Sequence, residues 1–275
     1  MGIVWRDGKF IEESQFTVSP QDRGLCHGLS LFETLLAVNG KPRLLPEHLV
    51  RFRSGMERLG VNSVELDEVG LGKVMTSLLE RNGLEKGMAR VRLALSLGKG
   101  ALDRIDSGTA WAWMTVEPVD GAVHSVRMTL APWRRDKESV LRGIKTGNYA
   151  EHLIALDMAR LEGFDEMLFY NTDDELCEAA IANVFLIRKG ALMTPSLDSG
   201  CLGGVTRELL IRLAAQHGIP CRERVLRKAD VSRADAMFLT SSVKGPVRVS
   251  ALQGENFPEH PLFDVLRSLW VEEMA

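Results

Sequence analysis

GIKTGNY, residues 143–149, is the stretch from which we read the rest of the chain, because it places Lys145 between two glycines in a short, tight segment. A lysine becomes a nucleophile when burial or a neighbouring cation lowers the pKa of its amine, and its usual covalent partner is then a carbonyl compound. Most lysines beside glycines lie in exposed turns. The segment alone therefore leaves both a surface turn and a catalytic lysine open.

The composition is that of an ordinary globular chain. Its 275 residues, 45% hydrophobic and 26% charged, suffice for one large or two moderate domains. A formal net charge of −3 leaves no basic surplus, which argues against nucleic acid or an acidic membrane as the main partner. We find no basic-then-apolar leader and no apolar run of about 18 residues, so we expect a cytoplasmic protein without a membrane partner.

The four cysteines, Cys26, Cys177, Cys201 and Cys221, show neither CxxC spacing nor pairing with histidines. This pattern favours reduced thiols over a disulfide or zinc framework. We expect them to behave as small buried hydrophobic residues, and we expect no metal site.

Residues 1–117 predict an α+β domain. Asp7-Gly8 between two apolar runs indicates a hairpin over about 2–11. The further elements expected in this part are a loop over 22–28, a strand over 29–38, a helix near Pro42 and Pro46, a helix over about 67–81, and strands over 89–97 and 110–116.

The first of these helices has a clear apolar stripe, formed by Leu49, Phe52, Met56 and Leu59. Four polar residues fall off that stripe and are expected on the solvated face: His48, Arg51, Arg53 and Glu57.

Pro, Asp and Gly cluster after residue 116, so we place a linker at 118–122 and a second domain at 123–275. Strands and helices alternate in this domain, giving an α/β class for the whole chain. The expected elements are strands over 126–131, 167–170, 177–187 and 236–242, and helices over 151–161, 205–217 and 262–274. In the first of these helices Leu153, Leu156 and Ala159 are expected to point inward.

Two loops of this domain carry chemistry. The pair Gly203-Gly204 opens a helix at Val205 and Thr206, where free N–H groups suit a phosphate, although an ordinary helix start capped by Thr206 has the same pattern. No Walker loop and no GxGxxG is present, which argues against ATP and NAD. Glu178 lies among alanines, where a buried carboxylate needs a cation such as a protonated pyridine nitrogen. The alternative is an ordinary strand glutamate that is satisfied by other groups or half exposed.

The order of these features is more specific than each alone. An HxxR helix, the lysine, Glu178 in ExxxxNxF, then TP and a GxTR helix start resemble the class IV pyridoxal-phosphate enzymes. That family includes branched-chain aminotransferases, D-amino-acid transaminases and aminodeoxychorismate lyases. The resemblance extends from Asp7-Gly8 to Pro246-Val247.

The resemblance implies a fold of two α/β domains, like that of D-amino-acid aminotransferase, with pyridoxal 5'-phosphate between them and a homodimer whose partner chain completes the substrate pocket. It also implies site roles. Lys145 would be the Schiff-base lysine and proton carrier, and Glu178 the partner of the pyridine nitrogen. The remaining implied cofactor ligands are Arg51, Val205, Thr206 and Ser242 at the phosphate and Tyr149 at the phenolic oxygen.

Within the family, local patterns favour the lyases. Lys145 and Tyr149 are separated by three residues, whereas the branched-chain enzymes have KxGGNY with four. FLTSSVKGPV at 238–247 resembles the lyase pattern FLTNSxRGxxPV and lacks the GTAAEITPV of transaminases. GLSLFET at 28–34 is similarly close to the lyase GDGLFET.

Two departures concern the substrate's carboxylates. Ser96-Leu97-Gly98 replaces the family's SRG or TRG, and His27-Gly28-Leu29 replaces FGD. Another cation must then bind a carboxylate. Lys244 follows Ser242 by two residues, so if that strand continues, both side chains lie on one face. The candidate substrate-binding residues are His27, Phe32, Arg92, Lys99, Arg104 and Lys244.

The sequence thus predicts an aminodeoxychorismate lyase-like enzyme that acts on a small molecule and forms pyruvate and 4-aminobenzoate for folate synthesis. Lys145 would take the α-proton and return it to the leaving group, with Thr34 helping. The alternative is a class IV transaminase for D-amino acids or (R)-amines. A pyridoxal-phosphate-binding protein without catalysis is disfavoured by the presence of both Lys145 and Glu178.

Overall fold

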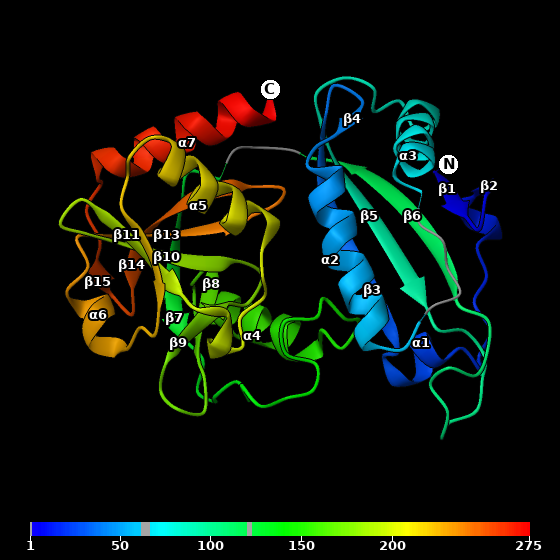
Figure 1. Ribbon diagram of the computed structural model, residues 1–275, viewed down its shortest axis with the longest axis horizontal. Helices are drawn as coiled ribbons and strands as arrows, with labels where there is room; N and C mark the ends of the chain where they lie inside the picture. Colours follow the sequence, from blue (N-terminus) through cyan, green and yellow to red (C-terminus); the bar gives the residue numbers. More distant parts are fainter. Residues whose placement is uncertain (1, 62–66, 120–122) are drawn as a thin grey trace. The chain divides into compact units, whose positions relative to one another are not determined.

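The computed structural model describes residues 2–61, 67–119 and 123–275 and has the mixed α/β fold that the sequence predicted (Figure 1). Unit 1 comprises Met1–Gly121 and Ile144–Asn148, and unit 2 comprises Ala122–Gly143 and Tyr149–Ala275. Where a linker was expected at 118–122, residue 118 still belongs to a strand, and residues 120–122 lie outside the described ranges. The lysine segment therefore packs with unit 1, although the chain on both sides of it belongs to unit 2.

Unit 1 is built on an antiparallel sheet of order β2-β1-β6-β5-β3-β4. The predicted hairpin between its first two strands is confirmed, because Asp7 and Gly8 take φ of 44° and 88°. The strands are β1 Ile3–Arg6, β2 Lys9–Glu12, β3 Ser30–Val38, β4 Lys41–Pro42, β5 Met88–Ser96 and β6 Trp111–Pro118. A short 3-10 helix, η1 Glu13–Gln15, follows β2.

Helix α2 Leu45–Arg58 packs against β3, and α3 Glu68–Arg81 packs against β1 and β6. The predicted apolar stripe of α2 is buried throughout. The prediction for His48 is wrong: this residue is 1% exposed, because it bonds to a buried carboxylate of β3 instead of water.

The segment 22–28, expected as a loop, contains the short helix α1 Arg23–His27. The Asp22 carboxylate caps it by accepting a hydrogen bond from the Leu25 N–H at 3.0 Å. Gly28 ends it in the left-handed conformation, with φ 68°. Asp22 and Gly28 therefore begin and end a helix, whereas the sequence analysis interpreted these residues as part of a loop.

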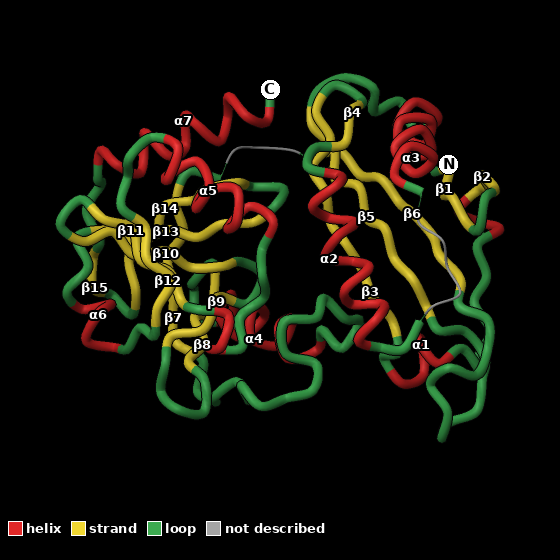
Figure 2. The backbone as a smooth tube through the Cα atoms, in the orientation of Figure 1, coloured by secondary structure: helices red, strands yellow, loops and turns green. Residues whose placement is uncertain are grey.

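Unit 2 contains a mixed sheet of order β12-β11-β10-β13-β14-β7-β8-β9, with β15 paired to β14 (Figure 2). β9 also lies against β10 and β11, so the sheet curls around an apolar interior. The strands are β7 Ser125–Leu130, β8 Glu166–Tyr170, β9 Leu176–Ala179, β10 Asn183–Arg188, β11 Ala191–Pro195, β12 Cys221–Arg224, β13 Ala236–Ser241, β14 Gly245–Leu252 and β15 Glu255–Asn256.

The single strand expected over 177–187 is two strands, β9 and β10, separated by a bend at 180–182. The Glu166 carboxylate accepts the Ala180 N–H at 3.0 Å and the Met167 N–H at 3.1 Å. The bend is stabilised by a residue that is distant in the sequence. The local sequence around the alanines therefore did not predict it. Burial raises the pKa of Glu166 to about 7, although these N–H groups oppose the shift.

The helices of unit 2 are α4 Ala150–Leu161, α5 Val205–Gln216, α6 Lys228–Ser232 and α7 Pro261–Met274, with a 3-10 turn η2 Leu197–Ser199. α5 and α7 pack together beside β13 and β14, and α4 packs against β8. The inward residues of α4 are Ala155, Leu156 and Ala159, whereas Leu153 is 55% exposed. The expectation for Leu153 is wrong because it assumed that every third residue faces inward. The helix repeats every 3.6 residues, so positions spaced by three gradually turn away from the buried face.

All four cysteines are free thiols, as predicted. Cys177 and Cys201 are buried and Cys221 is half-buried, but Cys26 on α1 is exposed, so the expectation of burial is wrong there. Burial raises the pKa of the Cys177 and Cys201 thiols. Within the described residues, no helix is long and apolar enough to cross a membrane.

Candidate active site

Lys145 lies in a segment that pairs with the start of β3. Its carbonyl accepts the Phe32 N–H at 3.0 Å, and the Gly147 N–H donates to the Ser30 carbonyl at 2.9 Å. A side chain at Gly147 would meet the Ser30 hydroxyl at 2.0 Å, so any other residue here would force that hydroxyl to move. The main chain thereby fixes where the lysine side chain begins.

The Lys145 amine is held over an aromatic ring. Its Nζ lies 4.4 Å from the centre of the Phe32 ring, and the Arg92 guanidinium lies 4.0 Å from the same ring. Thr34, two residues along β3, pairs in register with Arg92 on β5. The structure thus gathers four of the predicted site residues around one strand of unit 1.

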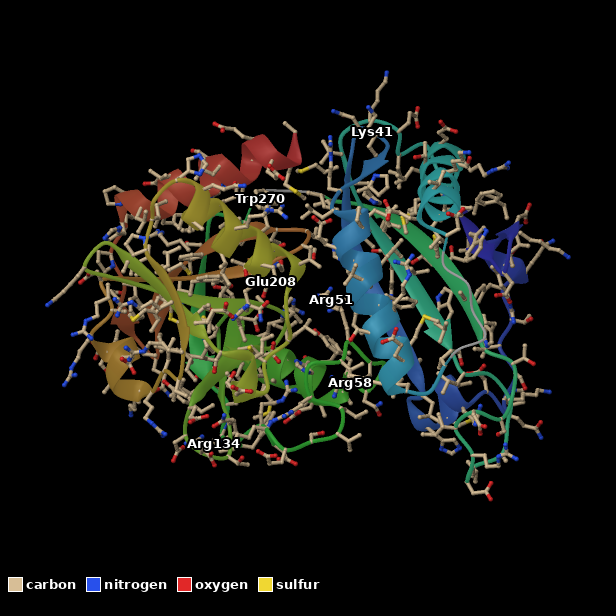
Figure 3. The ribbon with its side chains drawn as sticks, in the orientation of Figure 1. Lys41, Arg51, Arg58, Arg134, Glu208 and Trp270 are labelled. Carbon is tan, nitrogen blue, oxygen red and sulfur yellow. The ribbon has the colours of Figure 1, made fainter. Side chains whose placement is uncertain are left out.

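Arg51 projects from α2 (Figure 3), and its guanidinium is held by the carboxylate of Glu33 on β3. Nε lies 2.7 Å from Oε1, and Nη2 lies 2.6 Å from Oε2. His48 Nδ1 lies 2.6 Å from the same Oε2. The sequence predicted Arg51 but missed Glu33 and His48, although both stand in the motifs FET and HxxR.

Three predicted substrate-binding residues of unit 1 lie apart from these clusters: His27, Lys99 and Arg104. His27 is exposed at the end of α1, and Arg104 is exposed and paired with Asp106 at 3.2 Å. The loop that carries Lys99 and Arg104 is shaped by Arg23, which is 2% exposed. The Arg23 guanidinium donates to the carbonyls of Leu97, Gly98, Ala101, Arg104, Ile105 and Ser107.

In unit 2, Glu178 lies on β9 and is 6% exposed. Its Oε2 accepts the Leu202 N–H at 3.0 Å, and its Oε1 lies 3.4 Å from Nη1 of Arg135. Glu178 is therefore not half-exposed, but these two contacts satisfy its carboxylate, as the alternative of a satisfied strand glutamate allows. The buried charge is accompanied by a cation that no local sequence pattern revealed.

Arg135 links Glu178 to a stacked pair of rings. Tyr149 and His152 stack with centroids 4.3 Å apart and planes at 8°. His152 Nδ1 lies 2.6 Å from the Ala180 carbonyl, and Nε2 lies 2.8 Å from Arg135 Nη1. A carbonyl only accepts and a guanidinium only donates, so His152 is the neutral tautomer with its proton on Nδ1.

The start of α5 has the features of an anion site. Gly204 is the N-cap and brings no side chain to the first turn, so the alternative of a Thr206 cap is wrong. A side chain at Gly204 would meet Asn183 Oδ1 at 1.9 Å. The buried hydroxyls of Thr206 and of Thr240, which pairs in register with Asn183, have no hydrogen-bond partner.

A phosphate group would fit these hydroxyls together with the first N–H groups of α5, which begins at Val205. Glu208, in the first turn of this helix, is labelled in Figure 3. Thr240 was missed by the sequence analysis, although it stands beside the two serines of FLTSS. Among the described residues we find no cluster of His, Cys, Asp or Glu that could hold a metal ion.

Ser242 and Lys244 lie in the turn between β13 and β14, where Ser241 pairs with Gly245. The expectation that the strand continues through Lys244 is wrong, because Gly245 starts the returning strand with φ 63°. The argument that Ser242 and Lys244 share one strand face therefore fails. Lys244 is exposed.

Comparison with known proteins places the chain in a family. The family model of Amino-transferase class IV matches residues 30–252. The chain therefore belongs to this family and is a pyridoxal-phosphate-dependent enzyme, as the order of its motifs indicated. The anion site at the start of α5 and the buried Glu178 carboxylate fit that cofactor.

Three similar proteins carry two kinds of name. Aminodeoxychorismate lyase of Bacillus subtilis is 27% identical over 261 residues, which cover 93% of this chain and 88% of that protein. A Legionella pneumophila structure, provisionally named 4-amino-4-deoxychorismate lyase, has a TM-score of 0.90 and 30% identity, covering 96% and 98% of the two chains. Branched-chain aminotransferase of Thermoproteus uzoniensis has a TM-score of 0.92 and 26% identity, covering 98% and 94%.

Proposed function

We propose that this enzyme cleaves 4-amino-4-deoxychorismate to 4-aminobenzoate and pyruvate, a step of folate synthesis. The observation that carries the proposal is the tight hairpin of β13 and β14, which holds the lyase-like sequence FLTSSVKGPV. Gly245 must be glycine there, because a side chain would meet the Trp270 ring at 2.6 Å. The names of the Bacillus subtilis and Legionella pneumophila proteins support the same reaction.

The cofactor would be held by residues of this chain. Lys145 would carry it through its amine, and Glu178 would keep the pyridine nitrogen protonated. Thr206, Val205 and the β13–β14 turn at Ser242 would bind the phosphate together with Arg51, and Tyr149 would approach the phenolic oxygen. When bound, pyridoxal phosphate supplies an electron sink for the charge that remains when a proton leaves the substrate.

Lys145 would perform the proton transfers. Its amine would take the α-proton from the substrate and return a proton to the enolpyruvyl group as that group leaves, so that no further reactant is consumed. Thr34, half-buried on the same strand as Phe32, would assist through its hydroxyl. Arg92, beside the Phe32 ring, is the best-placed cation of unit 1 for a substrate carboxylate.

A second candidate is transamination of D-amino acids or (R)-amines with an α-keto acid. The similarity to a branched-chain aminotransferase structure, with a TM-score of 0.92, supports transamination in general. Removal of an α-proton by Lys145 is common to both reactions. For either activity we propose a homodimer.

A parallel assay distinguishes these functions. The enzyme loaded with pyridoxal phosphate is incubated with 4-amino-4-deoxychorismate, with D-alanine and 2-oxoglutarate, and with L-leucine and 2-oxoglutarate. We expect aminobenzoate and pyruvate in equal amounts from the first mixture, with a kcat/KM at least tenfold above either transamination. Faster transamination, or no aminobenzoate, would overturn the proposed lyase function.

A further inference from the structure

Glu33 is a buried carboxylate, and neither the family resemblance nor the proposed function assigns it a role. It lies on β3, is 1% exposed, and contacts two side chains of α2, Arg51 and His48. Positions 48 and 51 are three residues apart and so lie on one face of the helix, toward β3. We refer to these three residues as the Glu33 cluster.

The charges of the Glu33 cluster are defined by its contacts. Burial alone would raise the pKa of Glu33, but the Arg51 charge and the hydrogen bonds from His48 and Arg51 lower it to about 2. Burial lowers the pKa of His48, in spite of Glu33. At neutral pH the cluster therefore holds an anionic carboxylate, a cationic guanidinium and a neutral imidazole whose Nδ1–H donates to Glu33.

The contact between Glu33 and Arg51 is bidentate, with donor–acceptor distances of 2.7 and 2.6 Å. A two-point contact fixes both the position and the plane of a guanidinium. A free arginine side chain loses rotamer entropy when it binds an anion. In this protein most of that freedom is already lost on folding.

His48 has the same effect on the other partner. Its hydrogen bond to Oε2, at 2.6 Å, restrains rotation of the carboxylate itself. His48 therefore positions Glu33, and Glu33 in turn positions Arg51. The Arg51 side chain is 14% exposed. Arg51 is the member of the cluster that a ligand can reach.

We infer that Glu33 is a positioning residue that fixes the Arg51 guanidinium for the cofactor's phosphate. This inference depends on the proposed function, which makes Arg51 a phosphate ligand. Glu33 acts through Arg51, so its removal should weaken binding only of ligands that carry the phosphate. A carboxylate needed solely for folding would not discriminate between ligands with and without that group.

The test measures binding to the apoenzyme by the absorbance and fluorescence of the cofactor. Affinities for pyridoxal phosphate and for pyridoxal, which lacks the phosphate, are compared in Glu33→Gln, Arg51→Ala and the double variant. Glu57→Gln, an exposed glutamate on the same helix, is the matched control. Thermal unfolding of each apoenzyme is followed in parallel.

We expect Glu33→Gln to weaken pyridoxal phosphate binding about tenfold, with pyridoxal affinity within twofold of the parent and Glu57→Gln unchanged for both. The double variant should bind pyridoxal phosphate no more weakly than Arg51→Ala, because the effect of Glu33 passes through Arg51. If Glu33→Gln does not fold, Glu33→Asp, which retains the charge but shortens the side chain, should show the same selective loss at smaller size.

Two results separate the possible failures. If Arg51→Ala itself leaves pyridoxal phosphate affinity unchanged, the proposed role of Arg51 is wrong and the inference falls with it. If Arg51→Ala weakens pyridoxal phosphate selectively while the Glu33 variants bind it normally, or lose both ligands alike, the positioning role alone is overturned.

Discussion

Lys145 and Phe32 of β3 are in contact within unit 1: the lysine Nζ lies 4.4 Å from the centre of the phenyl ring. The Phe32 N–H also donates to the Lys145 carbonyl at 3.0 Å. Main chain and side chain of Phe32 thus both restrain the lysine. The ring adds a cation–π contact to the lysine amine.

Replacing Phe32 by leucine should therefore lower kcat about tenfold, because the amine loses its aromatic partner while the backbone bond remains. The measurement is steady-state turnover of the loaded enzyme. Phe10→Leu is the control, since it removes a similar contact of unit 1, to Arg81 at 4.4 Å, far along the chain from Lys145. Equal losses in both variants would mean that the ring matters only for folding.

Glu178→Gln should reduce kcat roughly 100-fold, because the amide keeps the shape but no longer stabilises a protonated ring nitrogen. Turnover and the absorbance of the bound cofactor are the readouts. Glu151→Gln serves as the matched control: Glu151 also contacts Arg135, at 3.4 Å, but is proposed to have no contact with the cofactor. Turnover of Glu178→Gln within twofold of the parent would show that this carboxylate is structural.

Arg92→Ala should raise KM for substrates that carry a carboxylate about tenfold and leave that for simple amines unchanged, because only the former lose a ground-state contact. Lys244→Ala should change neither value, because Lys244 lies in the β13–β14 turn and does not share a strand face with Ser242. If instead Lys244→Ala raises KM for carboxylate substrates only and Arg92→Ala changes neither KM, Lys244 has the role that the sequence suggested. Lys99 and Arg104 would be tested next.

Glu166 should make stability depend on pH. Its pKa is about 7 in the folded protein and ordinarily 4.5, so the folded state retains a proton between these values that the unfolded chain has released. Stability therefore falls as pH rises from about 4.5 to 7 and levels off above. The Lys244 charge, which lowers this pKa, limits the effect.

Glu166→Gln mimics the protonated form and should remove this dependence. Relative to the parent, the variant should gain on the order of 3 kcal/mol in unfolding free energy between pH 4 and pH 8. Denaturant unfolding across this range measures the gain, with the exposed Glu162→Gln as control. A difference between variant and parent that stays constant with pH would contradict the shift.

The sequence predicted those features whose chemistry is local. Lys145 between glycines, the HxxR helix and the GxTR helix start each contain their own signal within a few residues. Arg135 and His152 could not be predicted from local patterns. Arg135 reaches Glu178 from the loop after β7, where it pairs with Asn171. His152 reaches Ala180 through the packing of α4 against β8. The bend at 180–182 was missed for the same reason, since its stabilising carboxylate belongs to β8.

The error at Lys244 has a different origin. The run from Ala236 to Lys244 is compatible with one strand, and only the pairing of Ser241 with Gly245 shows where it ends. A glycine before proline was readable as a turn signal. The lyase pattern specifies the residue types of this segment and does not by itself predict where its backbone turns.

One measurement tests directly whether Lys145 is the residue that holds the cofactor. The enzyme loaded with pyridoxal phosphate is reduced with borohydride, digested, and mapped by mass spectrometry. We predict a single stable adduct, on Lys145, that is absent from Lys145→Ala. An adduct on another lysine of the parent, or one that persists in Lys145→Ala, would show that a different lysine holds the cofactor.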